Sequence, residues 1–403
     1  MIIFACKFYI SMKKILFSIF LFSCFNNIFS QQFIPYYATV SSQVSESNVF
    51  NTLTEFEDLG VKRRGTPALQ NTLNWLKNKY TSFGYNASQM VEYSFQNGSS
   101  TCKNLVLTKT GTVYPNTFVI ICGHYDTIAG TGTNDNGSGV TTILEVARLL
   151  QSIPTEYSIK FINFSGEEDG LIGSQSFVNS VVNATNPKMD IKLVFNIDEV
   201  GGRAGYDNSS IICERDTSSP TSNNAASNAV TNQLMTCVEY YSDLTAELSY
   251  AYSSDYIPFE ENNEIITGFF ESNETPYNHT INDLLENMDP YYVYQVAKAA
   301  TGAMMHFAVA STSALETENF EHSQMINFFP NPTNEYLTIS FGNLTQSESD
   351  FSLVDSAGKT VFMQKFKDPN SLETINIKAL SKGFYLAVIE NKTTRITKKI
   401  VIK

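Results

Sequence analysis

The chain has 403 residues, a formal net charge of −13, and a composition that is 42% hydrophobic and 13% aromatic. This length predicts roughly two or three domains, and the apolar content allows a large buried core. The acidic charge argues against a nucleic-acid partner, because binding to phosphates needs a basic face.

Residues 1–30 have the pattern of an export signal. Lys13 and Lys14 precede the apolar run 15–25, and a small residue stands before the expected cut. The run is shorter than the roughly 20 residues of a membrane span, and no other stretch of the sequence approaches a transmembrane helix. A lipoprotein cut before Cys24 is an alternative that the sequence leaves open.

Four cysteines remain after removal of the signal. Export would bring them into a compartment where disulfides form. Their positions in the sequence do not choose among the pairings that they allow. Cys122 lies in an apolar run beside a candidate ligand, which favours a buried free thiol there. The four are Cys102, Cys122, Cys213 and Cys237.

The first part of the mature chain, up to about residue 100, is predicted to be helical. Segments 47–59 and 68–83 carry apolar residues at helical spacing. Thr66 is expected to cap the second helix, with Pro67 in its first turn and Gly84 after its end.

Strands and helices alternate after that region. Several predicted strands are continuous apolar runs, as expected when helices cover both faces of a sheet. The alternation predicts an α/β domain over residues 31–312 with a doubly wound, mostly parallel sheet. The strands are expected at 104–107, 117–122, 158–164, 191–197, 209–213 and 265–270, and the helices at 139–151, 170–180, 225–241 and 290–309.

The C-terminal part has a different character. Residues 313–327 are polar and weakly patterned, which predicts a linker. Residues 328–403 form a series of short β-like runs, and their spacing predicts a small all-β antiparallel sandwich. This segment holds ten basic and seven acidic residues, unlike the acidic remainder, which supports a separate module.

Five short segments contain the residues of a candidate metal site. In an open α/β sheet, ligands bind beyond the carboxyl ends of the strands. His124, Glu167 and Asp198 follow directly from predicted strands, so we expect their side chains at one edge of the sheet. The segments are 123–126, 134–139, 166–168, 196–198 and 277–280.

These residue types suit a pair of zinc ions. Zinc binds histidine nitrogen and carboxylate oxygen, and two ions can share a carboxylate that offers one oxygen to each. Asp135, in a loop rich in glycine and asparagine, is assigned this bridging role. One Zn²⁺ is expected to bind His124, Asp135 and Asp198, and the other Asp135, Glu168 and His279.

Three more residues have expected roles in catalysis. Asp126 is two residues from His124, so its carboxylate can accept the second ring N–H and fix the tautomer. Glu167 is the candidate general base, because the adjacent Glu168 is already assigned to the metal. Tyr277 is the candidate donor to a developing oxyanion.

Each of these features has a structural alternative when taken alone. A single histidine is more often structural, a Glu-Glu pair is usually solvated, and a Gly- and Asn-rich loop is an ordinary turn. Their order and their shared placement after strands favour the metal site. The other two histidines, His306 on a predicted helix and His322 in the linker, have no expected role in it.

Segments 132–139 and 164–174 resemble the most specific motifs of peptidase family M28, the family of zinc aminopeptidases, and the similarity extends over residues 49–309. This resemblance implies a phosphorylase/hydrolase-like α/β fold, two co-catalytic zinc ions, and removal of the N-terminal residue of peptides. When the roles of the family's motif residues are transferred to this sequence, the resemblance implies the same zinc ligands and the same general base that residue type and position indicate.

The sequence departs from that family at several positions. Glu199 stands where the family usually has Met, and a carboxylate there could attract a substrate's ammonium group or could point into solvent. Tyr256 replaces a histidine, and Ser253 stands where some members have an arginine that helps bind substrate. Tyr277 is two residues before His279 rather than adjacent to it. The ligands are therefore better defined than the oxyanion and specificity residues.

The tail resembles the C-terminal sorting domain of type IX secretion substrates. The resemblance depends on Phe-Pro-Asn-Pro at 329–332, on segment 380–385 and on the closing run 398–403. It implies recognition by the type IX secretion machinery and export through the periplasm to the exterior of a Gram-negative outer membrane, free or attached to the cell surface. An ordinary β module that binds glycan or protein is the alternative.

Together these patterns predict a secreted di-zinc aminopeptidase that acts on peptides with a free N-terminus, through a water activated by Glu167. A glutaminyl cyclase-like enzyme with a single zinc is one alternative. A carboxypeptidase of the glutamate carboxypeptidase type is another, although the sequence shows no clear basic cluster for a substrate carboxylate. A non-catalytic binding protein displayed on the cell surface is the third.

Overall fold

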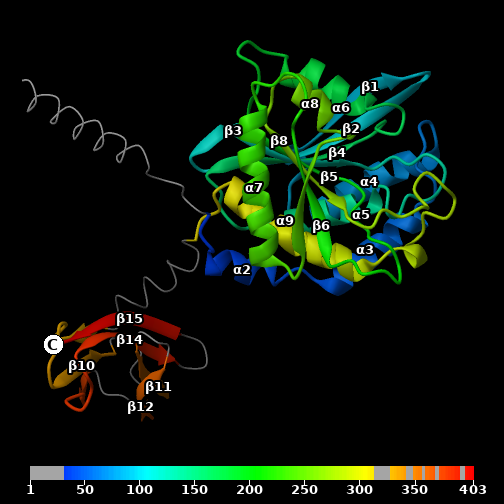
Figure 1. The fold of residues 1–403 in the computed structure, drawn as a ribbon. Helices are drawn as coiled ribbons and strands as arrows, with labels where there is room; N and C mark the ends of the chain where they lie inside the picture. The colour runs from blue at the N-terminus through cyan, green and yellow to red at the C-terminus, as the bar shows by residue number, and fades with distance from the viewer. Residues whose placement is uncertain (1–30, 313–326, 342–347, 356–358, 368–371, 391–394) are drawn as a thin grey trace, which may run out of the picture. The chain divides into compact units, whose positions relative to one another are not determined.

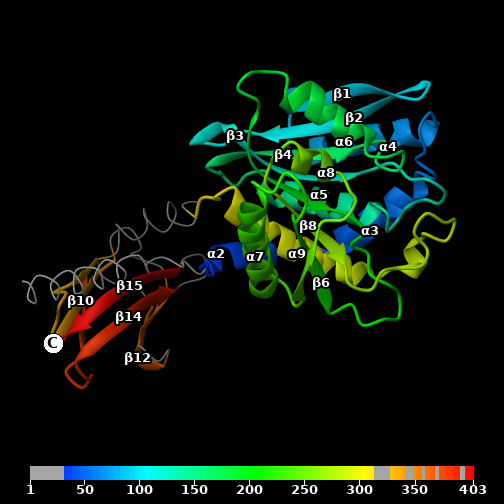
Figure 2. The ribbon, with the colours of Figure 1, turned by 45° about the horizontal axis from the view of Figure 1, so that its top comes forward.

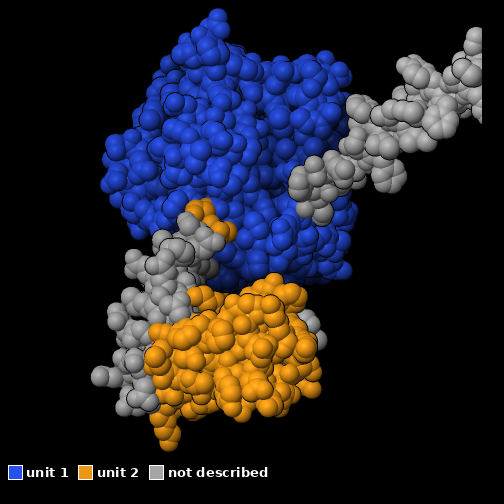
Figure 3. Space-filling view, turned by 90° about the vertical axis from the view of Figure 1, so that its left-hand side faces the viewer, with its two compact units in different colours: residues 1–310 blue, residues 311–403 orange. Residues whose placement is uncertain are grey.

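The computed structural model describes residues 31–312, 327–341, 348–355, 359–367, 372–390 and 395–403. The predicted signal peptide and most of the predicted linker lie outside these residues. The chain divides into two compact units, one ending at Ala310 and one beginning at Ser311 (Figure 3). Among the described residues, no helix has the length and apolar character of a membrane span.

An eight-stranded mixed sheet forms the middle of the first unit, in the order β1-β2-β4-β3-β5-β8-β6-β7 (Figure 1). The four strands β4, β3, β5 and β8 are parallel, and this confirms the predicted α/β class with its mostly parallel sheet. The strands are β1 (Met90–Asn97), β2 (Ser100–Lys109), β3 (Tyr114–His124), β4 (Tyr157–Phe164), β5 (Asp190–Ile197), β6 (Ser210–Arg215), β7 (Thr245–Tyr250) and β8 (Ile266–Glu271).

Helices cover both faces of this sheet (Figure 2). The larger core cluster joins one face to α3, α5, α7 and α9, and a smaller cluster joins the other face to α6 and α8. The helices are α2 (Pro35–Ser41), α3 (Glu46–Asp58), α4 (Pro67–Ser82), α5 (Gly137–Leu150), α6 (Ile172–Phe177), α7 (Asn224–Tyr241), α8 (Ile257–Glu261) and α9 (Pro290–Phe307), with single turns at η1 (Ala87–Gln89), η2 (Val178–Val182) and η3 (Leu285–Asn287).

Local sequence signals explain where α4 and α5 begin. The Thr66 side chain accepts a hydrogen bond from the backbone N–H of Leu69, and Pro67 follows at the first helical position, as predicted. The Asn136 side chain caps α5 in the same way by accepting from Gly139. This cap fixes the start of α5 directly beside Asp135, the predicted bridging ligand.

Two strands of the eight-stranded sheet were missing from the sequence prediction. Residues 90–97, expected in a largely helical region, form β1, which pairs with β2 across a turn at Gly98. Residues 245–250 form β7 beside β6. Both strands lie at the edges of the sheet and are largely exposed or half-buried, so neither shows the continuous apolar run of a central strand.

Cysteines Cys102, Cys122, Cys213 and Cys237 are buried free thiols, so no disulfide joins them in this structure. Cys122 lies within β3, as its apolar surroundings indicated. Cys213 and Cys237 lie in β6 and α7.

The second unit is all β, as predicted. One sheet has the order β13-β10-β9 and the other β12-β11-β14-β15, and the pairs within both are antiparallel. Apolar residues from both sheets share one core, which is the arrangement of a small sandwich. The strands are β9 (Asn327–Phe329), β10 (Tyr336–Ser340), β11 (Ser349–Val354), β12 (Thr360–Phe366), β13 (Leu372–Asn376), β14 (Gly383–Glu390) and β15 (Arg395–Ile402).

Candidate metal centre and active site

The candidate site lies at the carboxyl ends of three neighbouring parallel strands. His124 is the last residue of β3, and Asp198 directly follows β5. Glu167 and Glu168 follow β4 within a few residues, after Gly166, whose φ of +76° favours glycine. Because these strands are adjacent and parallel, their ends meet at one edge, as the sequence predicted.

Two loops complete the site. Asp135 precedes α5, and the backbone N–H groups of Asn134 and Asp135 donate to the Asp283 carboxylate at 2.8 and 3.0 Å. His279 lies in the loop after β8, with a positive φ of 58°. The Asp283 contacts therefore hold the bridging loop in place.

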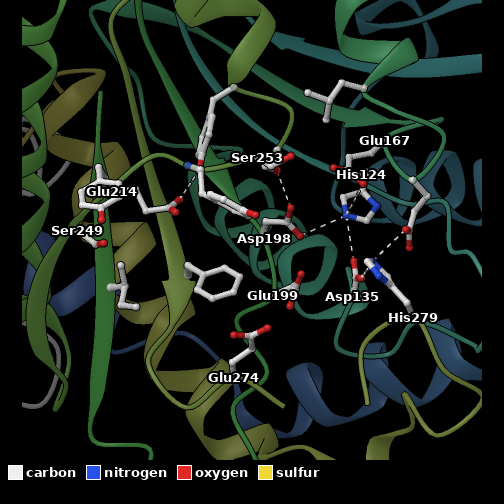
Figure 4. A pocket seen from close by; sticks show the side chains of 18 of the residues that line it. His124, Asp135, Glu167, Asp198, Glu199, Glu214, Ser249, Ser253, Glu274 and His279 are labelled. Atoms are coloured by element: carbon white, nitrogen blue, oxygen red, sulfur yellow. Dashed lines mark hydrogen bonds and ion pairs between the residues drawn. The ribbon is translucent and has the colours of Figure 1, made fainter. Parts of the chain in front are cut away.

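The five predicted ligands converge as two groups that share Asp135 (Figure 4). In the first group, Nε2 of His124 lies 3.2 Å from both Asp135 Oδ1 and Asp198 Oδ1. In the second, Nε2 of His279 lies 3.0 Å from Asp135 Oδ2 and 3.2 Å from Glu168 Oε2. Asp135 thus presents one oxygen to each group. Within each group, the ligand atoms lie within 4.8 Å of one another.

The chemistry of the site fits bound cations. Asp135 is only 3% exposed, and its Oδ2 has no hydrogen-bond partner of normal geometry although His279 Nε2 lies nearby. Burial and the neighbouring Asp135 carboxylate raise the pKa of Glu168 to about 8. Burial opposes ionisation of Asp135 too, but His124 and His279 outweigh it and keep its pKa well below the usual range. Two imidazoles alone do not offset so many carboxylates, whereas divalent cations would.

Asp126 contacts His124 differently from the prediction. The ring Nδ1 of His124 lies 3.1 Å from the backbone oxygen of Asp126, whereas the nearest carboxylate oxygen is 3.8 Å away. The backbone carbonyl therefore takes the ring N–H and fixes the tautomer. The Asp126 carboxylate instead accepts from the backbone N–H of Glu167 at 3.3 Å, so it positions the loop that carries the candidate base.

The adjacent glutamates have separate surroundings. Glu168 is a member of the second ligand group, whereas Glu167 belongs to neither group and lines the pocket. Its Oε2 lies 3.9 Å from His124 Nε2. Burial raises the pKa of Glu167 well above its usual value. A carboxylate so placed can accept a proton next to the two ligand groups without belonging to either of them.

Sequence reasoning missed two residues that orient the candidate ligands. The hydroxyl of Ser254 donates to Asp198 Oδ2 at 2.5 Å, and Asn196 in turn donates to Ser254 at 2.8 Å. Asp283 holds the Asp135 loop, as described above. Ser254 lies between Ser253 and Tyr256, two positions at which the sequence departs from the M28 family, but Asp283 lies outside every motif and gave no signal.

A pocket of about 630 Å³ opens beside the two ligand groups. All five candidate ligands and the candidate base line it, together with Glu199. Asn278 donates to the Glu199 carboxylate, which places Glu199 at the wall of the pocket rather than in solvent. Tyr277 is not among the lining residues, so its expected contact with an oxyanion stays a prediction.

Comparisons with known proteins agree with this geometry. Residues 104–304 match the model of peptidase family M28, and residues 327–403 match the secretion system C-terminal sorting domain. Aminopeptidase YwaD of Bacillus subtilis is 31% identical over 192 residues, which are 46% of this chain and 40% of that protein. The chain therefore spans about two fifths of the length of this relative.

Two solved structures share the fold. The Legionella pneumophila LapA aminopeptidase superposes with a TM-score of 0.60 and 21% identity, over 70% of this chain and 77% of that one. A Fimbriiglobus ruber glutaminyl cyclase gives a TM-score of 0.54 and 16% identity, over 65% of this chain and 95% of that one. The match at 104–304 includes every predicted ligand, and the second match coincides with the β-sandwich. The chain therefore belongs to peptidase family M28 and ends in a secretion system C-terminal sorting domain.

Proposed function

We propose that the protein is a secreted aminopeptidase that holds two zinc ions and removes the N-terminal residue of peptides. The observation that carries the proposal is the shared Asp135, which offers one oxygen to each of two His-and-carboxylate groups while Glu167 remains uncommitted beside them. The names of the YwaD and LapA relatives support the same activity.

In this proposal, His124, Asp135 and Asp198 hold one ion, and Asp135, Glu168 and His279 hold the other. Zinc ions at these positions would supply Lewis-acid polarisation of the scissile carbonyl and positive charge for the oxyanion that develops from it. Glu167 takes a proton from the attacking water and returns it to the leaving amine.

The other residues of the site act on position and charge. The Asp126 carbonyl and the Ser254 hydroxyl hold His124 and Asp198 in orientation. The acidic wall near Glu199 favours a positively charged N-terminus over a substrate carboxylate. This balance of charge supports an aminopeptidase rather than a carboxypeptidase.

The experiment compares matched peptides with free and acetylated N-termini, with and without a chelator, while zinc content is measured by elemental analysis. We expect release only from the free N-termini, loss of release on chelation, and two zinc ions per chain. Cyclisation of N-terminal glutamine with one zinc per chain would support the glutaminyl cyclase alternative instead. Bound zinc without turnover of any peptide would support a binding protein.

The C-terminal unit supports the proposal that the protein is secreted. Its match to a secretion system sorting domain implies secretion or surface attachment. We assign recognition by the type IX machinery to residues 328–403, in keeping with the motifs at both ends of that segment.

A further inference from the structure

The pocket extends well beyond the two ligand groups. Figure 4 shows Glu214 and Ser249 on the opposite side of the pocket from Asp135 and His279, with Glu199 between them. Three glutamates outside the candidate catalytic set line this part, namely Glu199, Glu214 and Glu274. Among the described residues that line the pocket, none is a lysine or an arginine. The extension is therefore strongly acidic.

Glu214 is the most informative of these glutamates. It lies on β6 and is 6% exposed, and its Oε2 accepts a hydrogen bond from the hydroxyl of Tyr256 at 2.9 Å. Its Oε1 has no hydrogen-bond or salt-bridge partner among the described residues. Gly268 leaves room for this arrangement, because a Cβ there would lie 2.7 Å from Glu214 Oε2. A buried carboxylate without a cation is costly, so a cationic partner would be strongly favoured.

The pocket that contains Glu214 also has apolar walls. Ile212 and Phe270 come from the neighbouring strands β6 and β8, and Tyr252 lies in the loop after β7. Such walls suit the methylene stem of a long side chain, which can pack on apolar surface while its charged end reaches a polar group.

We infer that this extension receives the side chain of the substrate's first residue and that it favours lysine or arginine. Glu214 accepts the charged end of that side chain, and Ile212 and Phe270 contact its stem. The inference depends on the proposed aminopeptidase function and adds the class of substrate to it.

The test uses the purified enzyme with four fluorogenic aminoacyl-coumarin amides, of lysine, arginine, leucine and norleucine. Norleucine has the stem of lysine without the ammonium group, so the ratio of kcat/KM for lysine to that for norleucine isolates the effect of charge. We expect this ratio to be about ten or more, because a buried charge pair contributes at least the binding free energy that corresponds to a tenfold change.

The variant Glu214→Gln keeps an acceptor for Tyr256 and removes the charge. We expect it to lower the lysine-to-norleucine ratio about tenfold or more, since the charge pair is lost. Glu247→Gln is the matched control, because Glu247 lies exposed on the neighbouring strand β7 and does not line the pocket. It should leave the ratio at the wild-type value.

A second measurement keeps the inference testable should Glu214→Gln fail to fold. Lysinamide should inhibit the wild-type enzyme at a concentration about tenfold or more below that of norleucinamide, for the same reason.

Turnover of leucine and norleucine substrates without any preference for lysine or arginine would overturn the cationic subsite and leave the aminopeptidase standing. An unchanged ratio in a folded Glu214→Gln enzyme would overturn the role of Glu214. Absence of release from every unblocked substrate would reject the aminopeptidase itself, and this inference with it.

Discussion

Glu167 and Glu168 are neighbours in the sequence but differ in what their carboxylates contact. Only Glu168 belongs to a ligand group. We therefore expect Glu167→Gln to retain both zinc ions and to lose about a hundredfold or more in kcat, the contribution of a general base. Elemental analysis and steady-state kinetics on the same sample check this.

The matched variant is Glu168→Gln, which removes a charged ligand and should reduce zinc content as well as rate. Equal turnover by Glu167→Gln and the wild-type enzyme would exclude Glu167 as the base. Loss of zinc from Glu167→Gln would instead assign it to the metal.

The sequence predicted which residues gather at the site better than it predicted how they touch. Residue type and strand-end position were enough for His124, Glu168 and Asp198, because parallel strands bring their carboxyl ends to one edge. Asp135 and His279 lie in loops, and only residue type and motif indicated them. The contact of His124 with Asp126 uses the backbone rather than the carboxylate, a detail set by the path of the loop. The role of Asp283 depends on a contact across about 150 residues, which no local pattern contains.

The start of α5 connects helix, strand and metal site through one side chain. Asn136 is fully buried; its Oδ1 accepts from the backbone N–H of Gly139 and Glu199, and its Nδ2 donates to the carbonyl of Ile197. Asn136→Ala removes the cap and leaves buried backbone groups without partners. We expect a loss of about 2 kcal/mol or more in the free energy of unfolding, and weaker zinc binding because Asp135 is adjacent.

Thr66→Ala is the control for this element. It removes the cap of α4, far from the ligands in sequence, and should cost about 1 kcal/mol without changing zinc content. Denaturant unfolding and a zinc titration of both variants separate the two effects. Equal zinc affinity in Asn136→Ala and Thr66→Ala would contradict the link between the cap and the site.

Helix α9 contains a histidine that should make stability depend on pH. His306, expected to be structural, accepts a hydrogen bond at Nε2 from the Tyr241 hydroxyl at 2.7 Å. Burial lowers its pKa from 6.5 to about 4. Between pH 6.5 and about pH 4, the unfolded chain binds more protons than the folded chain. The free energy of unfolding therefore decreases as the pH falls from 6.5 towards 4.

His306→Gln keeps an acceptor for Tyr241 and removes this titration. We expect the fall in Tm between pH 6.5 and pH 4.5 to be smaller in the variant than in the wild-type protein, by a modest amount because the imidazole is only partly buried. Acid titration of the metal site is common to both proteins and cancels in the comparison. Identical pH profiles would show that folding does not lower the pKa of His306.

The elements of the fold were predictable where burial was complete. Central strands β3, β4 and β5 and helices α5 and α9 carry strong apolar patterns and lie close to their expected positions. The edge strands β1 and β7 were not predicted, because half-exposed strands mix polar and apolar residues without a clear period.

At the scale of the whole molecule, the two units have separate cores. The clusters of the first unit end at Ala310, and that of the second begins at Phe328. Every candidate ligand, the candidate base and every residue that lines the pocket belong to the first unit. Catalysis and sorting should therefore be separable.

We accordingly expect removal of residues 311–403 to leave the kcat/KM of the purified enzyme within about twofold of the full chain, since no side chain of the site is lost. In a bacterium with a type IX secretion system, the shortened chain should accumulate in the periplasm, and activity should disappear from the medium and the cell surface.

Fusion of 311–403 to an unrelated periplasmic protein is the complementary test, and should carry that protein outside the cell. Export of the shortened chain would show that the sorting signal lies elsewhere. A loss of catalytic rate on removal of 311–403 would mean that the second unit supports the first, which separate cores and a complete site in the first unit argue against.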